Sequence, residues 1–409
     1  MKIPRRTKLA TALAIALISQ AGVPLTARAE TTFKVSGYGT LAGTVTDEGE
    51  REFRPSMNHA IGASHGMDFF GDSKLGLQGV ANFGNGFSVT GQLLGQRRRV
   101  DDAPRSNEDF NVGFEWLFAQ YSPTANIDIR AGRVVLPAFM ISDSRNVGYS
   151  QPWLRAPLSV YAGMPLSNLD GGQLNLRIPM SSAILTLQPS YGRSSYNISS
   201  GTPTGVLVIK DRSKWVAGLN ASLEMGDWLF RAGQVRSRTP DLSLDLLGPL
   251  TAPLSYNMKD TFTTAGLQFD NGSAVVMAEW TKRKMSDLPV NGGLSGGEEP
   301  FYQGSGYAGR PLAKTDAFYV GAGWRFGSVL PMLTYGRTRN LLTGVKNHEL
   351  SASVRYDFMT NVALKAQVSR FNARDGQAFV TPAFSTPLGT DADYNKKINV
   401  FSVGLDFVF

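Results

Sequence analysis

The sequence predicts an all-β protein, an antiparallel transmembrane β-barrel of about 16 strands with short periplasmic turns, long extracellular loops and an inward-folded third loop. Three observations predict this fold class. Stretches of roughly ten residues alternate apolar and polar side chains throughout the chain after residue 30, their connections are alternately short and long, and the last stretch closes on Phe409. Outer-membrane barrels combine these features, because their strands face lipid on one side and water on the other.

The first stretch shows the alternation clearly. Phe33, Val35 and Leu41 lie at odd positions, whereas Lys34 and Ser36 lie between them. Because side chains alternate across a strand, one face of this stretch is apolar and the other is polar. The same pattern recurs at 74–83, 87–96, 110–118, 127–131, 172–178, 183–192, 215–225, 228–238, 261–269, 273–284, 314–326, 329–339, 347–356, 362–371 and 397–409.

The connections between these stretches alternate in length, which favours a membrane barrel over a soluble fold. Short turns lie at 84–86, 226–227, 270–272, 327–328 and 357–361. Long polar segments rich in glycine lie at 47–72, 99–109, 193–212, 239–260, 285–313 and 372–396. Short turns on one side and long loops on the other are typical of outer-membrane barrels, whereas a soluble sandwich has no reason to keep this order. The strand count is even if both chain ends lie on the short-turn side.

The two faces of the predicted strands differ in a way that indicates a lumen. Aromatic residues cluster at strand ends on the apolar face, as the girdles at a membrane interface require. The opposite face holds polar and charged residues, among them Lys74, Gln92, Arg130, Glu279, Arg283, Lys365 and Gln367. A buried unpaired charge costs several kcal/mol, so we expect this face to contact water as the wall of a channel. The alternative is a soluble protein of two sheets with one wet face.

Residues 1–29 are predicted to form a signal peptide, which leaves residues 30–409 as the barrel. Basic residues precede an uncharged, mostly apolar run at 9–23, and Ala27 and Ala29 supply the small residues of a cleavage site. The alternative is a membrane-anchoring helix, but the apolar run is short for a span. The segment holds five basic and no acidic residues, so without it 36 basic and 33 acidic side chains remain, and the net charge falls from +8 to +3.

Composition and motif spacing argue against several other classes of function. A small net charge without a polybasic tract gives no support for nucleic-acid binding. The chain has no cysteine, so neither a disulfide framework nor a thiolate metal site is possible. His59 and His65 share a loop without an evident third metal ligand, and nothing near His348 indicates a nucleophile. We therefore expect no enzyme activity, no cofactor and no bound metal.

Residues 134–171, which follow the fifth predicted strand, are the best candidate for a loop that narrows the lumen. This segment is long, irregular and rich in proline. We expect Asp143 to supply a negative charge there, and Arg145 and Arg155 positive ones. The predicted pore-lining residues of the wall are Lys74, Arg98, Arg130, Arg133, Glu279 and Arg283. A negative loop opposite a positive wall would create a transverse field, and the excess of basic residues predicts a mild preference for anions.

Each of these charges also has a simpler interpretation. The cluster Arg97-Arg98-Arg99 lies beside a long loop and could bind lipopolysaccharide phosphates from outside instead of lining the lumen. Asp143 and Arg145 could pair with each other in a stiff loop. The prolines and the tryptophan between residues 152 and 157 could serve only to pin the loop to the wall. The sequence leaves these alternatives open.

Several segments resemble the Gram-negative porin superfamily, over essentially the whole chain after the signal peptide. The resemblance rests on the opening strand Lys34–Gly39, the second strand Ser73–Gly79, the hairpin Tyr356–Leu364, the stretch Arg130–Arg133 followed by Leu136-Pro137, and the last strand with Val403, Leu405, Phe407 and Phe409. The stretches at 143–149 and 152–157 are similar to a porin-like proteobacterial branch.

The resemblance implies a 16-stranded homotrimeric channel in the outer membrane of a Gram-negative bacterium, through which small hydrophilic solutes and ions diffuse passively. It implies that Leu405, Phe407 and Phe409 form the signal read by the barrel-assembly machinery, and that the partners include outer-membrane lipid and lipopolysaccharide. Two alternatives remain. One is a substrate-selective channel for small carboxylates or similar anions, and the other is a barrel with a plugged lumen whose loops act as a surface receptor or adhesin.

Overall fold

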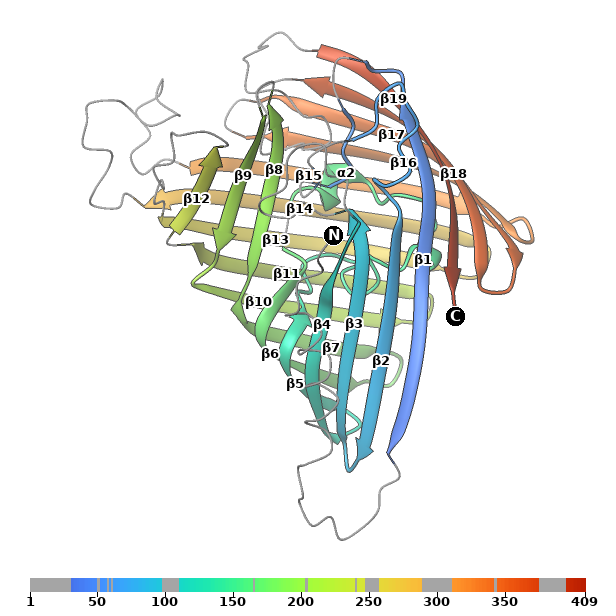
Figure 1. Ribbon diagram of the computed structural model, residues 1–409. Helices are drawn as coiled ribbons and strands as arrows, with labels where there is room; N and C mark the ends of the chain where they lie inside the picture. The colour runs from blue at the N-terminus through green and yellow to red at the C-terminus, as the bar shows by residue number, and fades with distance from the viewer. Residues whose placement is uncertain are drawn as a thin grey trace, which may run out of the picture.

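Sixteen strands form a closed antiparallel barrel (Figure 1), which confirms the predicted fold class and strand number. The computed structural model describes residues 31–49, 52–56, 59, 62–97, 110–164, 166–202, 205–239, 241–246, 257–288, 311–341, 344–374 and 395–409. The barrel strands are β1 (Thr32–Thr46), β2 (Lys74–Gly84), β3 (Phe87–Arg97), β4 (Phe110–Thr124), β5 (Ile127–Val135), β6 (Asn168–Pro179), β7 (Ile184–Arg193), β10 (Trp215–Met225), β11 (Trp228–Thr239), β13 (Asn257–Asp270), β14 (Ala274–Leu288), β15 (Pro311–Trp324), β16 (Val329–Asn340), β17 (Lys346–Met359), β18 (Val362–Arg374) and β19 (Asn395–Val408). β1 pairs with both β2 and β19, which closes the barrel.

The apolar row of β1 faces outward and its polar row faces the lumen, as the alternation predicts. Phe33, Val35 and Leu41 are exposed, whereas Thr40 and Thr44 are buried on the inner side. An apolar outer surface of this kind is unfavourable in water but is the surface that lipid requires. Among the residues that the structure describes, no helix is long and apolar enough to cross a membrane.

The barrel closes where two glycines of β1 leave room for two aromatic rings at the chain end. Gly39 lies opposite Phe407, and the N–H of Gly37 donates to the carbonyl of Phe409 at 2.8 Å. A Cβ on Gly39 would lie 2.3 Å from the Phe407 ring, so a larger residue would have to displace that ring. The last strand therefore packs directly on the first.

Two of the long connections contain a separate small sheet. β8 (Ser195–Thr202), β9 (Gly205–Arg212) and β12 (Asp241–Leu246) pair antiparallel in the order β12-β9-β8. Figure 1 shows these strands at the rim of the barrel, on the side of the long loops. They are not predicted from the sequence, because β12 pairs with β9, which lies in a different connection. The sequence of either connection alone does not reveal this pairing.

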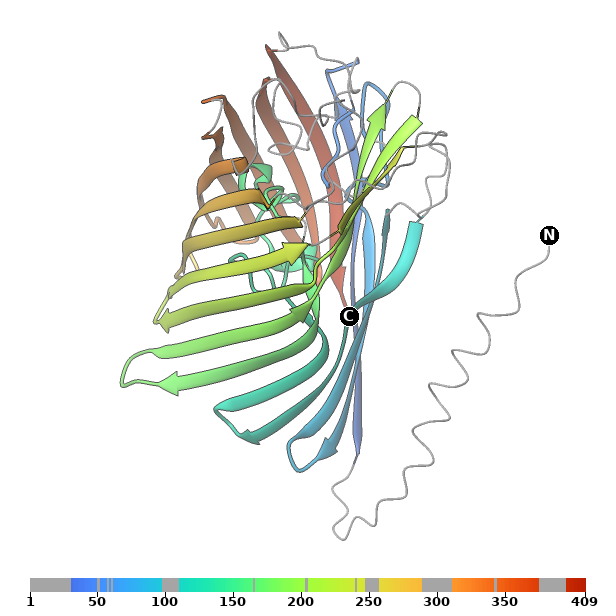
Figure 2. The same cartoon turned by 90° about the vertical axis from the view of Figure 1, so that its left-hand side faces the viewer.

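The connection between β5 and β6, called loop 3 (residues 136–167), folds back into the barrel as predicted. It contains the 3-10 helix η1 (Gly148–Ser150) and one turn of α-helix, α2 (Leu158–Tyr161). η1 contacts β1 and β19, and α2 contacts β14 to β17, which lie half a barrel away from β5 in strand order. Figures 1 and 2 show this part of the chain enclosed by the strands. Loop 3 therefore crosses the lumen and reaches the opposite wall.

Candidate functional site

Loop 3 has an apolar side that packs on an apolar patch of the inner wall. Phe139 and Tyr161 of the loop meet Phe262 of β13 and Tyr319 of β15, and all four side chains are buried. The ring centroids of Phe139 and Phe262 are 5.1 Å apart, and those of Tyr161 and Tyr319 are 5.9 Å apart. The inner wall is therefore less polar than the sequence predicts. The apolar patch is stable there because loop 3 shields it from water.

Glu279 and Arg283 of β14, two predicted pore-lining residues, lie beneath this side of the loop. The Glu279 carboxylate accepts hydrogen bonds from the Met140 N–H at 3.0 Å and from the Tyr161 hydroxyl at 2.6 Å. Arg283 donates to the carbonyl of Gly163 at 2.9 Å. Both side chains are buried, so they hold the loop in place and do not contact an open lumen.

A buried ion pair anchors the middle of loop 3. Lys365 of β18 is 1% exposed, and its ammonium group pairs with Asp406 of β19 at 2.7 Å. The same group donates to three loop carbonyls, those of Gly148 and Gln151 at 2.7 Å and that of Trp153 at 3.1 Å. These acceptors offset much of the cost of removing the cation from water. A Cβ on Gly148 would lie 2.1 Å from Asp406 Oδ1, so glycine lets the loop backbone reach the pair.

These contacts correct one sequence-based prediction. The sequence predicts that Glu279, Arg283 and Lys365 contact water, because an unpaired buried charge is costly. In the structure all three are buried, and each is partnered by a group of loop 3. The prediction is wrong because these loop partners lie between 118 and 217 residues away along the chain.

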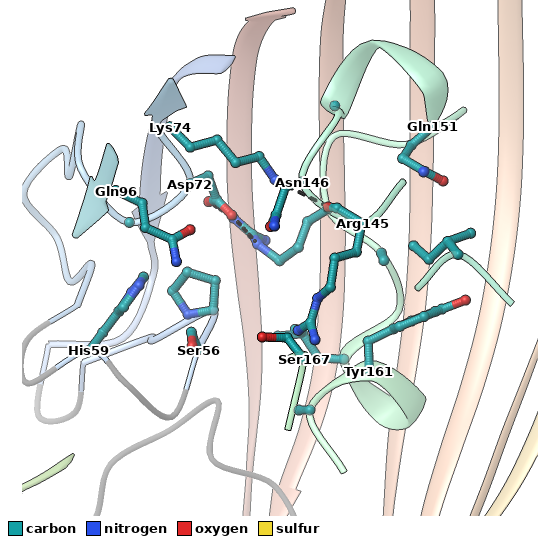
Figure 3. Close-up of a pocket in the computed structure, with 18 of the residues that line it drawn as sticks. Ser56, His59, Asp72, Lys74, Gln96, Arg145, Asn146, Gln151, Tyr161 and Ser167 are labelled. Atoms are coloured by element: carbon teal, nitrogen blue, oxygen red, sulfur yellow. Dashed lines mark hydrogen bonds and ion pairs between the residues drawn. The ribbon is translucent and has the colours of Figure 1, made fainter. Parts of the chain in front are cut away.

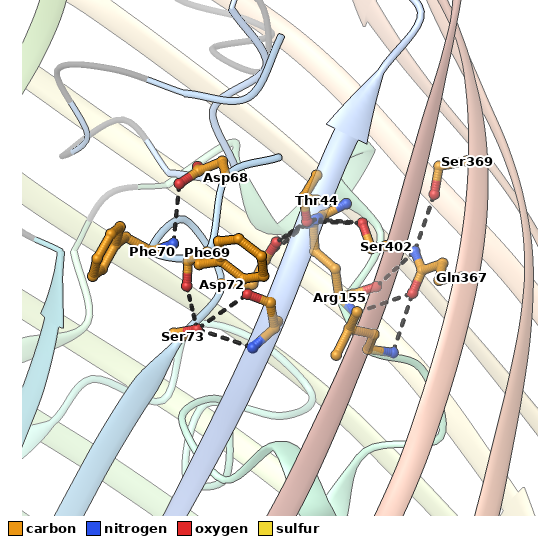
Figure 4. A network of polar contacts seen from close by, with 12 residues as sticks. Thr44, Asp68, Phe69, Phe70, Asp72, Ser73, Arg155, Gln367, Ser369 and Ser402 are labelled. Carbon is orange, nitrogen blue, oxygen red and sulfur yellow. Dashed lines mark hydrogen bonds and ion pairs between the residues drawn. The ribbon is translucent and has the colours of Figure 1, made fainter. Parts of the chain in front are cut away.

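Arg155 joins loop 3 to the wall and to the first long connection, called loop 1 (residues 47–73), as Figure 4 shows. Its Nε donates to Asp72 Oδ1 at 2.9 Å, and its Nη2 donates to Thr44 Oγ1 at 3.2 Å and to Ser402 Oγ at 3.1 Å. Burial opposes ionisation of Asp72, but the Arg155 charge and the hydrogen bonds to the carboxylate outweigh it. The pKa of Asp72 therefore lies below its usual range.

A polar cavity of about 390 Å³ lies between loop 3, loop 1 and the wall (Figure 3). Its border includes Lys74 of β2, Gln96 of β3 and Glu115 of β4, Arg145 and Asn146 of loop 3, and Ser56 and His59 of loop 1. The Lys74 ammonium donates to the Arg145 carbonyl at 3.4 Å, and both residues border the same cavity. Arg155 and Asp72 also border the cavity and neutralise each other. In the described part of the border, the two remaining cations, Lys74 and Arg145, outnumber the single remaining carboxylate, Glu115.

Asp143 and Arg130 lie nearer the short turns of the barrel. The Asp143 carboxylate pairs with Arg231 of β11 at 3.1 Å and is 46% exposed. Arg130 is on the inner side of β5, where it donates to Gln120 at 2.8 Å and to Gln173 at 3.3 Å. These charges are on the inner side of the barrel, as the sequence predicts for Arg130, but they do not border the cavity.

Arg133 differs from its prediction. It lies three residues after Arg130, so strand alternation places the two side chains on opposite faces of β5. Its cross-strand neighbour Leu117 is exposed on the outer face, and its guanidinium pairs with Asp170 at 2.7 Å. Arg133 therefore points away from the lumen.

The arginine cluster at 97–99 is only partly described. Arg97 is buried, and it pairs with Asp68 of loop 1 at 2.7 Å. The predicted pore-lining residue Arg98 lies outside the described residues, as does Arg99. The described part of this cluster therefore holds loop 1 against β3.

The three histidines have different surroundings. Among the described residues, no group of three or more histidine, aspartate or glutamate side chains could hold a metal ion. Burial and the Arg97 charge lower the pKa of His59 to about 4, so its ring is uncharged at neutral pH. His65 contacts a loop 1 carbonyl, and His348 contacts a tyrosine hydroxyl at 2.8 Å.

The chain matches a protein-family model and several solved structures. The model described as Gram-negative porin matches residues 10–376. No curated protein sequence matches the chain. Three solved structures with a similar fold are an anion-selective porin from Comamonas acidovorans (15% identity, TM-score 0.55, 93% of this chain and 100% of that chain), the outer membrane channel DcaP of Acinetobacter baumannii (12%, 0.56, 94% and 99%) and the trimer form of OmpT, an outer membrane protein of Vibrio cholerae (11%, 0.53, 93% and 99%). At these identities, the solved structures show the fold alone.

Proposed function

The chain belongs to the Gram-negative porin family and is an outer-membrane channel. On that premise, we propose that small hydrophilic solutes and ions diffuse through it passively, with a mild preference for anions. The observation that carries the preference is the charge at the cavity border. Lys74 and Arg145 both border the cavity and outnumber Glu115 there, while Arg155 and Asp72 cancel.

Physical chemistry links this charge excess to the passage of ions. A narrow opening with low-dielectric walls focuses the field of the charges around it, so it raises the local concentration of ions of opposite sign. His59 adds no charge at neutral pH, since its pKa is about 4. A related fold supports the proposal, because the similar porin of Comamonas acidovorans is anion-selective.

The reversal potential in a salt gradient across a planar bilayer tests the preference. We expect the channel to favour chloride over potassium, and the charge-reversed variant K74E/R145E to favour potassium. Arg236→Glu is the matched control, because Arg236 is exposed on the outer face of β11 and should leave the reversal potential unchanged. A clear potassium preference of the unmodified channel would contradict the proposal.

A second candidate, a channel selective for small carboxylates, is favoured by two buried nitrogen atoms. Within the described part of the chain, Trp153 Nε1 and His59 Nδ1 have no hydrogen-bond partner, and both residues border the cavity. An indole N–H on the same cavity border as Lys74 can donate to a carboxylate oxygen. Succinate should then reduce the single-channel chloride current, and Trp153→Phe should weaken this block. A block of equal strength in the variant would count against a carboxylate site at Trp153.

We infer that the channel assembles as a homotrimer through the outer face of its first strands. Leu41 of β1 and Val112 of β4 are exposed near the long loops, where the surface of this arc stays apolar. The Vibrio cholerae OmpT, which is similar in fold, was solved in a trimer form. Val112→Lys should yield monomers in native mass spectrometry. Leu333→Lys, at an exposed position on β16, is the control that should leave the trimer intact.

We propose that residues 1–29, which lie outside the described residues, are an export signal cleaved after Ala29. N-terminal sequencing of the protein isolated from membranes tests the cleavage site.

We also propose that Leu405, Phe407 and Phe409 are recognised during assembly into the membrane. Phe409→Ser should lower the amount of folded barrel in cells but not its refolding from urea, which separates recognition from stability.

A further inference from the structure

Loop 1 is a second connection that folds into the barrel. Its Phe53 is completely buried and belongs to an apolar cluster with Phe371 of β18 and with Ile398 and Val400 of β19. Phe401 is exposed on the outer face of β19, so Val400 beside it points inward. Phe371 lies directly opposite Ile398 and shares this inner face. The Phe53 ring therefore packs on the wall of the lumen, a position that the sequence predicts only for loop 3.

Backbone pairing gives the described part of loop 1 the form of a hairpin with a fixed base. Phe53 and Ala63 exchange both N–H to carbonyl hydrogen bonds, at 2.7 and 2.8 Å. Farther along the loop, Asp68 exchanges two such bonds with Thr44 of β1, and its carboxylate pairs with Arg97 of β3. The base of loop 1 is therefore held by wall strands, and the Phe53 ring anchors the hairpin farther along.

Loop 1 also contacts loop 3 inside the barrel. Leu158 of α2 belongs to the same apolar cluster as Phe53. The guanidinium of Arg155 lies over the Phe53 ring, 4.6 Å from its centroid, and a cation in this position is attracted by the ring face. The same guanidinium pairs with Asp72 at the end of loop 1 (Figure 4). One arginine of loop 3 therefore joins two parts of loop 1 and fixes the two loops relative to each other.

The hairpin lies on the long-loop side of the middle of loop 3. Phe371 is near the end of β18 that leads into a long connection, whereas Lys365, which binds the loop 3 backbone, is six residues closer to the short turn. Pro55, Ser56 and His59 of the hairpin border the cavity. Figure 3 shows Ser56 and His59 across the cavity from Tyr161 of loop 3. A solute that enters from the long-loop side therefore meets loop 1 before it meets the middle of loop 3.

On the basis of the passive diffusion proposed above, we propose that loop 1 and loop 3 together set the largest solute that the channel admits. Permeation depends on the free cross-section at the narrowest level, and a second loop inside the lumen reduces it. Pro55, Ser56 and His59 supply the bulk on the loop 1 side. Phe53 is a positioning residue, since it anchors the hairpin on the wall and does not border the cavity.

The hairpin of β8 and β9 provides a matched control for loop 1. It also belongs to a long connection and is paired antiparallel, but it lies at the rim of the barrel (Figure 1). Of its described residues, Ser195 borders the cavity, whereas the residues near its tip do not. Shortening this tip removes a similar length of chain without widening the passage.

The swelling of channel-containing liposomes in uncharged sugars tests the proposal, because such sugars respond to size and not to the charge of the border. The shortened variant replaces residues 54–62 with Asn-Gly, a two-residue turn that can join the paired residues Phe53 and Ala63. The control joins Ser199 to Val208 in the same way. We expect the ratio of raffinose entry to arabinose entry to rise about threefold in the shortened variant and to stay unchanged in the control.

Two substitutions of Phe53 separate positioning from stability. Phe53→Ser removes the apolar anchor and should raise the same ratio, whereas Phe53→Leu keeps an apolar side chain on the wall and should preserve it. A merely structural role would make Phe53→Ser less resistant to urea with no change in the ratio.

A shortened variant that admits arabinose with the ratio of the unmodified protein would overturn this proposal and leave passive diffusion intact. If neither the unmodified protein nor the shortened variant admitted either sugar, passive diffusion would be contradicted as well.

Discussion

The two sides of loop 3 use charged residues in opposite ways. On the wall side, Lys365 and Glu279 are buried and have several hydrogen-bond partners each. On the cavity side, Lys74 and Arg145 border a polar opening. Buried, partnered charges are costly to disrupt and do not reach solutes, whereas charges at an opening act on passing ions through their field. The wall side therefore sets the position of the loop, and in our proposal the cavity side sets the selectivity.

A comparison of two lysines on the inner wall shows what decides the difference. Lys365 has Asp406 and three loop carbonyls as partners within 3.1 Å. Lys74 donates to one loop carbonyl at 3.4 Å and borders the cavity. Both residues are lysines on the inner face of a strand. The difference in their hydrogen-bond partners therefore comes from the path of the loop 3 backbone.

The largest effect is expected from Lys365→Met on the wall side. The variant leaves Asp406 buried without its cation and removes three bonds to loop 3. We expect the free energy of unfolding, measured by urea titration in vesicles, to fall by about 3–5 kcal/mol. The double variant K365M/D406N buries no charge and should recover much of this loss. If it is as unstable as the single variant, the ion pair does not anchor the loop.

A smaller and pH-dependent effect is expected from Arg155→Gln, which removes the cation beside Asp72. The folded-state pKa of Asp72 is lowered, so its ion pair stabilises the protein fully above the usual pKa of aspartate and loses this effect as pH falls through the lowered value. At pH 7 we expect the variant to be less stable by about 2–3 kcal/mol. The difference from the unmodified protein should shrink in acid. A difference that stays constant from pH 7 to pH 3 would show that the carboxylate is not involved.

Tyr161→Phe should lower the free energy of unfolding by a smaller amount, because it removes one of several hydrogen bonds to Glu279 and keeps the packing of the ring. We expect a loss of about 1.5–3 kcal/mol in urea unfolding with an unchanged single-channel conductance. Tyr121→Phe is the matched control, since Tyr121 is 38% exposed on the outer face. Equal losses in the two variants would mean that the Glu279 bond contributes nothing to stability.

The smallest effect on stability is expected from Lys74→Gln on the cavity side. Changes away from buried contacts alter stability by less than about 0.5 kcal/mol. The reversal potential, however, should move toward cations. A loss of stability as large as that of Lys365→Met would remove the distinction between the two sides of loop 3.

The positions of the strands were predictable because alternation is local. Residues such as Phe33, Val35 and Leu41 define a face without reference to any other part of the chain. The same rule places Arg130 inward and Arg133 outward once both lie in one strand. The small sheet that contains β12 was not predictable, because its pairing joins two different connections.

By itself, the sequence determined that a closed barrel forms, which rows face outward, and that a long segment after the fifth strand is available to enter the lumen. Only the tertiary structure decided which inward charges are buried and which border the cavity. Lys365 and Trp153 are 212 residues apart along the chain, yet the lysine donates to the tryptophan carbonyl. The physical reason is that burial and hydrogen bonding depend on where the loop backbone comes to rest, and alternation along a strand carries no information about that path.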